Sequence, residues 1–177
     1  MPPRMTEFHL GNITLRSTTG SDLPDLLALW NDGRVMQWVG FPEGLGYDYP
    51  KLTRWFRQLQ TSPHRHHFVV QSDTLGFCGE TYYQVDSPHR RAGLDIKLIP
   101  QAQGQGIATK ALGILIRRVF DTEPEVEAVW TEPAEKNVAA RRLYARCGLQ
   151  PAGRPKDMKP FDSYWELRRE KAGNPGQ

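Results

Sequence analysis

The stretch QGQGIATKAL, from Gln103 to Leu112, decides which fold and which chemistry the sequence points to. Its two glycines, Gly104 and Gly106, stand directly before apolar residues that repeat at helical spacing. Backbone N–H groups at such a place are not shielded by side chains, and the N-terminus of a helix favours negative charge. The stretch therefore predicts a binding site for an anion such as a phosphate.

Two common phosphate-binding patterns do not fit this stretch. A Walker A loop has a lysine directly after its last glycine, whereas Ile107 follows Gly106. A dinucleotide fingerprint has a third glycine where this chain has Thr109, and it belongs to the first β-α turn of its domain. Neither nucleotide triphosphate hydrolysis nor dinucleotide binding is therefore expected.

The composition is that of one globular α/β domain. Of the 177 residues, 38% are apolar and 24% are charged, and the formal net charge of +3 mildly favours an anionic partner. We expect one domain over residues 8–170, with flexible tails at 1–7 and 171–177. No apolar run is long enough to span a bilayer, so we expect a cytoplasmic protein with no membrane partner. Cys78 and Cys147 lack metal-ligand spacing and are expected to be reduced.

Hydrophobic periodicity predicts the element order βααβββαβαβ. Strands are expected at residues 13–16, 67–71, 75–85, 91–99, 126–131 and 163–167, and helices around residues 23–30, 52–59, 107–119 and 136–147. Gly33 is expected to end the first helix. The three middle strands suggest an antiparallel meander, and a βαβ unit is expected from Leu94 to Thr131. This order predicts a mixed sheet covered by helices.

Two segments carry a resemblance to a known family. Gln103 to Ala108 resembles motif A of the GCN5-related N-acetyltransferases, Gln/Arg-x-x-Gly-x-Gly/Ala, and Asn137 to Leu149 resembles motif B. Asn137 and Tyr144 are seven residues apart and so share one face of a helix. The resemblance covers nearly the whole chain, and its details are similar to the aminoglycoside 6′-N-acetyltransferase and ribosomal-protein N-acetyltransferase branches.

The resemblance implies a fold and a cosubstrate. The fold is a single-domain, mostly antiparallel mixed sheet flanked by helices, with a splayed central strand pair in which the pantetheine of acetyl-CoA runs. No metal is implied. The residues that the resemblance assigns to acetyl-CoA are Leu98, Ile99, Gln103, Gly104, Gln105, Gly106, Ile107, Ala108, Thr109, Asn137 and Tyr144.

The resemblance also implies the reaction, in which a primary amine attacks acetyl-CoA directly within a ternary complex. Alkyl amines hold their proton up to about pH 10.4, so a carboxylate or a water chain has to remove it. Asp95 occupies the position of the family's aspartate before motif A, and Glu80 on the neighbouring strand is the reserve candidate. Tyr144 is the candidate that protonates the leaving thiolate.

The acceptor amine stays open at this point. An aminoglycoside-like or polyamine-like molecule is expected, but the loop Ser87-Pro88-His89-Arg90-Arg91 is basic and departs from the drug-modifying enzymes. A protein N-terminus and a small amine that carries carboxylates are alternatives within the family. Candidate aromatic residues for the acceptor wall are Trp38, Phe41, Tyr47, Tyr82 and Tyr83.

Other classes of function predict other features. A non-catalytic acyl-CoA-binding sensor keeps motif A without using Asp95 or Tyr144. A nucleic-acid-binding module needs a basic recognition helix or an aromatic-basic strand motif, and the sequence has neither. His64, His66 and His67 are expected to lie in a solvated loop rather than to bind a metal. A homodimer is expected from the frequency of dimers among soluble proteins.

Overall fold

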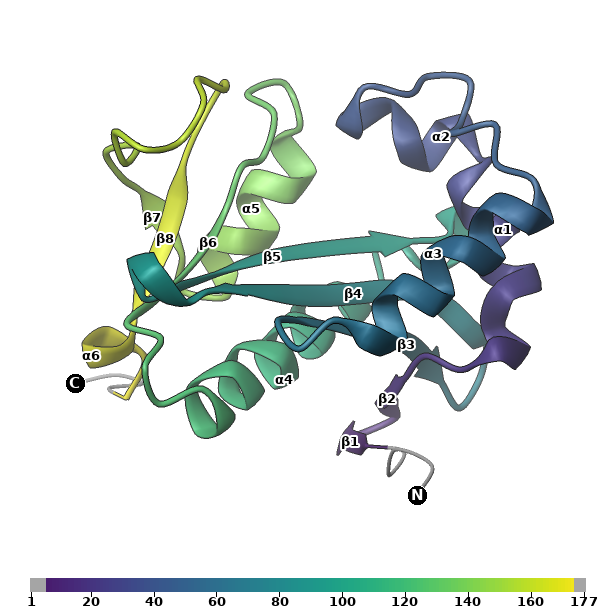
Figure 1. The fold of residues 1–177 in the computed structure, drawn as a ribbon, viewed down its shortest axis with the longest axis horizontal. Helices are drawn as coiled ribbons and strands as arrows, with labels where there is room; N and C mark the ends of the chain where they lie inside the picture. The colour runs from purple at the N-terminus through teal and green to yellow at the C-terminus, as the bar shows by residue number, and fades with distance from the viewer. Residues whose placement is uncertain (1–5, 174–177) are drawn as a thin grey trace.

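A computed structural model of the chain describes residues 6–173, which form one sheet with the strand order β1-β2-β3-β4-β5-β6-β8-β7 (Figure 1). The strands are β1 (Glu7–Leu10), β2 (Ile13–Ser17), β3 (Arg65–Ser72), β4 (Gly76–Asp86), β5 (Arg91–Leu98), β6 (Ala128–Thr131), β7 (Gln150–Pro151) and β8 (Trp165–Arg168). The helices are α1 (Leu23–Trp30), α2 (Gly33–Met36), α3 (Tyr49–Thr61), α4 (Ile107–Thr122), α5 (Val138–Arg146) and α6 (Arg169–Ala172). The predicted α/β class, the meander and the βαβ unit are confirmed.

The sheet opens in its middle. All neighbouring strands are antiparallel except β5 and β6, which are parallel and pair only at three positions, from Arg91↔Ala128 to Gly93↔Trp130. From Leu94 to Leu98, β5 has no strand partner on this edge in the described sheet. The predicted splayed central pair is therefore confirmed.

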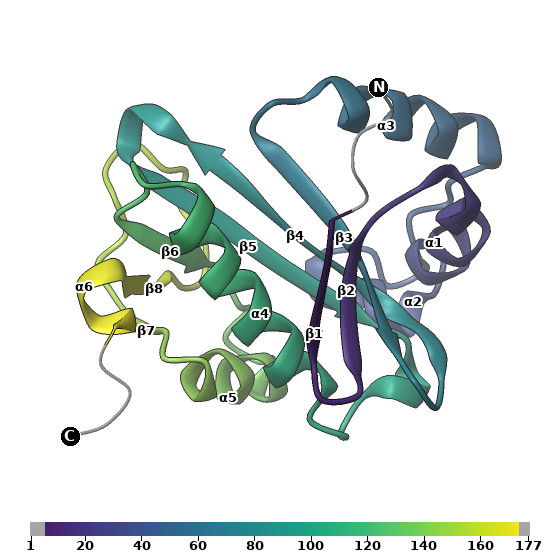
Figure 2. The ribbon, with the colours of Figure 1, turned by 90° about the horizontal axis from the view of Figure 1, so that it is seen from below.

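The two faces of the sheet carry different side chains. On β5, Leu94 and Leu98 join the large apolar cluster, to which α4 contributes its stripe of buried aliphatic residues. Figure 2 shows α4 running across this face of the sheet. Asp95 and Lys97 alternate with these residues and so point to the opposite face. Helices α1 and α3 cover part of that opposite face with a second apolar cluster that includes Leu26, Trp30 and Leu52. The period of two along β5 thus separates the core from a polar face.

One expected boundary is wrong. Gly33 does not end the first helix, because α1 already stops at Trp30 and Gly33 is the first residue of α2. Asp32 caps α2 by accepting a hydrogen bond from the Arg34 backbone N–H at 2.9 Å. A Cβ atom at Gly33 would lie 2.0 Å from the carbonyl oxygen of Pro42, so close packing rather than helix termination requires this glycine.

Short edge elements escaped the sequence analysis. β1 and β7 lie at the two edges of the sheet and are only four and two residues long, so the single alternation of Phe8 and Leu10 in β1 is too short a signal and β7 has none. β1 begins at Glu7 and α6 extends to Ala172, so the ordered elements reach slightly past the expected boundaries of 8 and 170. Of the rest of the expected tails, residues 1–5 and 174–177 lie outside the described residues, and only residues 6 and 173 are described.

The expectation of a solvated histidine loop is wrong for two of the three histidines. His64 is exposed, but His66 and His67 belong to β3. His66 stacks on Tyr83 at 4.6 Å between ring centroids, and the side chain of His67 is fully buried. Four consecutive polar residues, 64–67, suggested a loop, whereas Arg65 to His67 pair with β4 and Trp55 of α3 packs on His67 at 4.9 Å between ring centroids.

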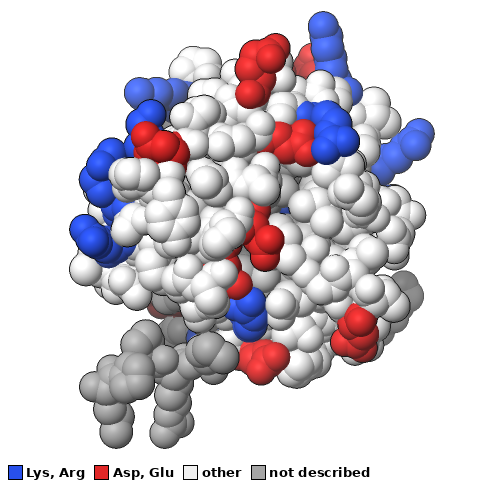
Figure 3. Space-filling model, turned by 90° about the vertical axis from the view of Figure 1, so that its right-hand side faces the viewer, with Lys and Arg blue, Asp and Glu red and all other residues white. Residues whose placement is uncertain are grey.

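The surface of the described residues carries both signs of charge. Acidic and basic side chains are mixed over the face that Figure 3 shows, with uncharged surface between them. Within residues 6–173, no helix combines the length and the apolar character that crossing a membrane requires.

Candidate active site

A cavity of about 620 Å³ follows the opening between β5 and β6, and we call it the splay cavity. Five segments line it: the second half of β5, the glycine loop with the start of α4, the end of β6 with the loop after it (residues 131–134), one face of α5, and the segment of α2 and the following 3₁₀ turn that carries Arg34, Val35, Trp38 and Val39. Most of the residues expected to bind acetyl-CoA line it, namely Leu98, Gln103, Gly104, Gly106, Ile107, Ala108, Thr109, Asn137 and Tyr144.

Two expected residues are not among its lining residues. The backbone N–H of Ile99 donates to the carbonyl of Cys78 at 2.8 Å, and its side chain packs against both apolar clusters. Gln105 is exposed and donates its side-chain amide to the carbonyl of Gln101 at 2.6 Å. Ile99 therefore belongs to the sheet and the core, and Gln105 fixes the loop.

The glycine loop has the backbone that the sequence suggested. Gly104 and Gly106 have φ values of +72° and +75°, which favour glycine over residues with a Cβ atom. A Cβ at either position would meet nothing within 4 Å, so the space beside the loop is open. No side chain caps α4, and the N–H groups of its first turn from Ile107 to Thr109 have no intrahelical acceptors. The loop and the helix end together present backbone donors to the cavity.

Helix α5 supplies the opposite wall. Asn137 is its N-cap, and its side-chain oxygen accepts a hydrogen bond from the Ala140 N–H at 3.1 Å. Two turns later, Tyr144 also lines the splay cavity and is only 5% exposed. Burial raises the pKa of Tyr144, and the negative charge of Asp95 adds to this effect. Tyr144 is therefore a protonated hydroxyl at neutral pH.

A second cavity of about 620 Å³, the side cavity, lies against β4, β5 and β6. Tyr82, Gln84, Trp130 and Glu132 are among its lining residues. Asp95 lines both cavities. A molecule in the side cavity and a molecule in the splay cavity would thus both have access to this carboxylate.

Asp95 belongs to a chain of buried polar groups on the polar face of the sheet. One of its oxygens accepts the Ile96 N–H at 2.9 Å, and the other contacts the Lys97 ammonium. Lys97 also lies 3.6 Å from Glu80 Oε1, and Glu80 Oε2 is 2.8 Å from His67 Nε2. Burial alone would raise the pKa of Glu80, but His67 and Lys97 outweigh burial and lower it to about 2. Glu80, the reserve candidate for the base, lies behind Lys97 and is not among the residues that line either cavity.

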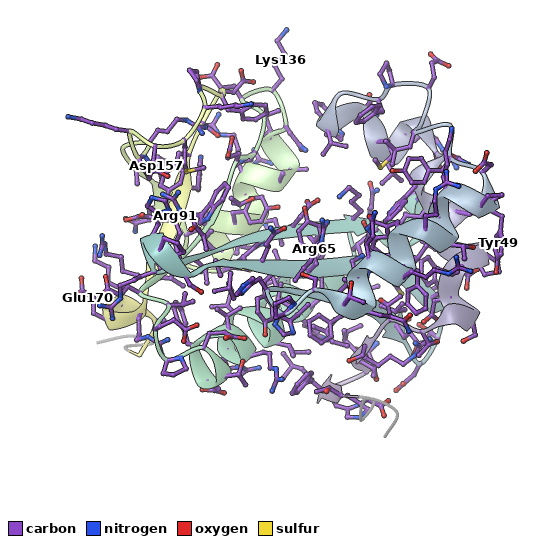
Figure 4. The ribbon with its side chains drawn as sticks, in the orientation of Figure 1. Tyr49, Arg65, Arg91, Lys136, Asp157 and Glu170 are labelled. Atoms are coloured by element: carbon purple, nitrogen blue, oxygen red, sulfur yellow. The ribbon has the colours of Figure 1, made fainter. Side chains whose placement is uncertain are left out.

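The basic loop before β5 is neutralised by fixed partners. Arg91 is buried and pairs with Asp86 at 3.0 Å and with Asp157. Figure 4 labels Arg91 and Asp157, which lie close together. Arg90 pairs with Glu127 at 3.2 Å. His89 lies 2.9 Å from Asp86, and although Asp86, His89 and Asp157 are close enough to share an ion, Arg91 already occupies both carboxylates. The loop therefore presents little free positive charge to the side cavity.

The five aromatic candidates are divided by the fold. Trp38 lines the splay cavity and is 43% exposed, and Tyr82 lines the side cavity. Tyr83 is fully buried on the other face of the sheet, and its hydroxyl lies 3.0 Å from Glu123. Tyr47 packs on Trp30, and Phe41 is exposed without being a lining residue of either cavity.

The sequence analysis missed several charged residues of the splay cavity. They are Arg34, Lys97, Glu132, Arg142 and Arg146. Lys97 could have been found, because it stands two residues after Asp95 on the same strand and must share its face. Arg34 and Glu132 come from segments far away in sequence, and only the fold brings them to the cavity.

Comparisons with known proteins agree on one family. Residues 12–150 match the model of the acetyltransferase (GNAT) domain. The aminoglycoside N(6′)-acetyltransferases type 1 of Klebsiella pneumoniae and Serratia marcescens are each 25% identical over 155 residues, which is 80% of this chain and 76% of theirs. The fold is similar to spermidine N-acetyltransferase from Vibrio cholerae in complex with CoA and spermine, with a TM-score of 0.79, 21% identity, and 93% of this chain and 100% of that one covered.

Proposed function

Because the chain belongs to the GNAT acetyltransferase family and is an acetyl-CoA-dependent N-acetyltransferase, we propose that it acetylates the primary amine of a small molecule by direct attack within a ternary complex. The observation that carries this proposal is that Asp95, on the stretch of β5 that has no partner in β6, lines both cavities, as does Glu132 after β6. The splay cavity receives acetyl-CoA, and the side cavity receives the amine.

Acetyl-CoA is recognised mainly by backbone. The N–H groups of the glycine loop and of the first turn of α4 bind the diphosphate, because they are unshielded and the helix dipole favours negative charge. The open edge of β5 from Leu94 to Leu98 offers peptide groups to the pantetheine. Arg142 and Arg146, which line the same cavity from α5, add positive charge for phosphate groups.

Asp95 and Tyr144 act on the reacting atoms. The incoming amine is an ammonium at neutral pH, so it first binds to the Asp95 carboxylate, which then takes its proton. The neutral amine attacks the thioester carbonyl, and the thiolate of CoA leaves. Tyr144 protonates that thiolate, because its hydroxyl lines the cavity and carries a proton at neutral pH. The nitrogen loses its second proton as the tetrahedral intermediate collapses and the C–S bond breaks, and this proton restores the Tyr144 hydroxyl. Asp95 returns the first proton to solvent, so the products are the amide, the CoA thiol and one proton.

The acceptor we propose is aminoglycoside-like or polyamine-like. Relatives of both kinds occur among the comparisons, and the side cavity is lined by the carboxylates of Asp95 and Glu132, which suit a molecule with several amino groups. The basic loop at residues 87–91 argued against such an acceptor. Its arginines are neutralised by Asp86, Glu127 and Asp157, so this objection loses its force.

A thiol-release assay tests the proposed function. The purified chain is given acetyl-CoA together with aminoglycosides, polyamines, hydroxylamines or peptides with a free N-terminus. Acceleration of CoA release by polyamines or aminoglycosides, with the acetylated amine identified by mass spectrometry, is the expected result. Acceleration by peptides alone would point to protein N-terminal acetylation, and binding of acetyl-CoA without acceleration by any amine would point to an acyl-CoA sensor. The cytoplasmic location and the homodimer stay predictions.

A further inference from the structure

The polar face of the sheet holds an unusual arrangement of charge beside the reacting position. By the strand register, Tyr82 lies opposite Asp95 and Glu80 lies opposite Lys97, so all four side chains point to the same face. The side chains of Lys97 and Glu80 are 12% and 2% exposed, respectively. A buried ammonium is stable only when it is paired, and this one has two carboxylates within reach.

Asp95 is not an open carboxylate in this arrangement. Its Oδ1 accepts the Ile96 N–H, and its Oδ2 contacts the Lys97 ammonium. Burial by itself would lower the pKa of Lys97, but the charges of Asp95 and Glu80 outweigh burial and raise it, so Lys97 stays a cation. A positively charged acceptor that approaches Asp95 therefore meets a cation already in place.

Glu80 offers that cation another position. Its Oε2 is engaged by His67 at 2.8 Å, whereas its Oε1 has Lys97 as its neighbour at 3.6 Å, longer than a hydrogen bond. His67 is itself fixed by Thr18 at 2.7 Å from its other ring nitrogen, so Glu80 is held in place from behind. A small movement of the flexible lysine side chain would close the distance to Oε1.

We infer that Lys97 is a specificity-determining residue that exchanges partners when the acceptor binds: it yields Oδ2 of Asp95 to the ammonium of the acceptor and moves onto Oε1 of Glu80. This inference rests on the proposed function, because it assigns the acceptor to Asp95. Lys97 thereby screens Asp95 from stray cations, and Glu80 keeps the lysine paired in both states. The exchange favours acceptors whose ammonium binds Asp95 more strongly than Lys97 does.

The test is a double-mutant cycle on acceptor affinity. Spermidine is titrated by calorimetry into the full-length chain saturated with CoA, for the wild type, Glu80→Gln, Lys97→Met and the double variant. Glu80→Gln removes the second position of Lys97 and is expected to weaken spermidine binding about tenfold, the effect of one charge-assisted hydrogen bond. Lys97→Met removes the competitor and is expected to tighten binding.

The double variant distinguishes a movement of Lys97 from Asp95 to Glu80 from a direct electrostatic attraction between Glu80 and the acceptor. If Lys97 exchanges partners, Glu80→Gln loses its effect once Lys97 is gone, whereas two independent charges would give additive effects. Additive effects, unchanged affinities, or no spermidine binding by any of the four proteins would overturn the inference. Asp73→Asn, on the exposed turn between β3 and β4, removes one negative charge elsewhere and is expected to leave the affinity unchanged.

Folding and activity are checked separately. Thermal melting establishes that each variant is folded. If Lys97→Met does not fold, Lys97→Arg replaces it, and because arginine keeps the positive charge, this variant is expected to bind spermidine as tightly as the wild type does. Thiol release by the wild type combined with additive affinities overturns the exchange alone. Absence of thiol release with every amine overturns the proposed function, while the calorimetric cycle still decides on the exchange.

Discussion

The two ends of β5 carry similar charged residues and use them differently. At its start, Arg91 lies where β5 pairs with β6, and its guanidinium is held by Asp86 and Asp157. At its other end, Asp95 and Lys97 lie where the pairing with β6 has ended and two cavities reach the strand. Where β5 is paired with β6, its charged residue makes a fixed structural contact. Where β5 has no partner in β6, its charged residues can be reached by a ligand.

Asp95→Asn is the substitution with the largest expected effect on activity. It removes the proton acceptor at the open end of β5, so kcat/KM for the amine is expected to fall about 10²- to 10⁴-fold. Steady-state thiol release measures this value, and calorimetry with CoA shows whether the splay cavity is intact. Full activity of this variant would mean that a water chain or another group takes the proton.

Tyr144→Phe is expected to lower kcat about 10²-fold, at the low end of the range for general acid–base catalysis, because water can partly replace the hydroxyl. The KM for acetyl-CoA should change little, since the ring that lines the cavity remains. The measurement is kcat at saturating concentrations of both substrates. An unchanged kcat would make Tyr144 a packing residue.

Gly106→Ala tests the backbone N–H groups of the glycine loop and of the first turn of α4, which lie beside the unpaired end of β5. At a φ of +75°, a Cβ atom costs about 1 to 2 kcal/mol, and relief of that strain would turn the first N–H groups of α4 away from the cavity. The affinity for CoA is expected to fall about 5- to 30-fold, measured by calorimetry. Gly113→Ala in the middle of α4 is the matched control, because a Cβ there meets nothing within 4 Å and the helix favours alanine.

Arg91→Met is expected to have the smallest effect on activity. It tests the start of β5, where the strand is paired with β6. It leaves Asp86 and Asp157 without their shared partner, so the melting temperature should fall by several degrees. The values of kcat and KM for both substrates should stay those of the wild type at a temperature where the variant is folded. A specific rise in the acceptor KM would show that the basic loop takes part in recognition after all.

Much of the fold followed from sequence because its signals are local. The apolar stripe of α4, the strand-forming segments of β3 to β5 and the glycines before α4 are each signals carried by neighbours in the chain. The segments that sequence reasoning misjudged depend on distant contacts. Gly33 is needed by the carbonyl of Pro42, and His67 is buried by the pairing of β3 with β4.

The candidate site shows the same difference between features that neighbouring residues determine and features that distant contacts determine. The residues of motif A and Tyr144 of motif B belong to consecutive elements of the chain, since β5, the glycine loop, α4, β6 and α5 follow one another. The partners of Asp95 could not be read in the same way. Glu80 reaches Lys97 only through the register of β4 on β5, and the arginines of the basic loop are neutralised by residues as distant as Asp157. Long-range ion pairs decide which charges are free, and sequence spacing does not reveal them.

The most direct test of the central claim is a crystal structure of the protein with CoA. The account predicts that the diphosphate lies against the backbone of Gly104, Gly106 and the first turn of α4, that the pantetheine follows the unpaired edge of β5 from Leu94 to Leu98, and that the thiol ends near Asp95 and Tyr144. CoA bound elsewhere on the molecule, with the opening between β5 and β6 unoccupied or closed, would contradict it.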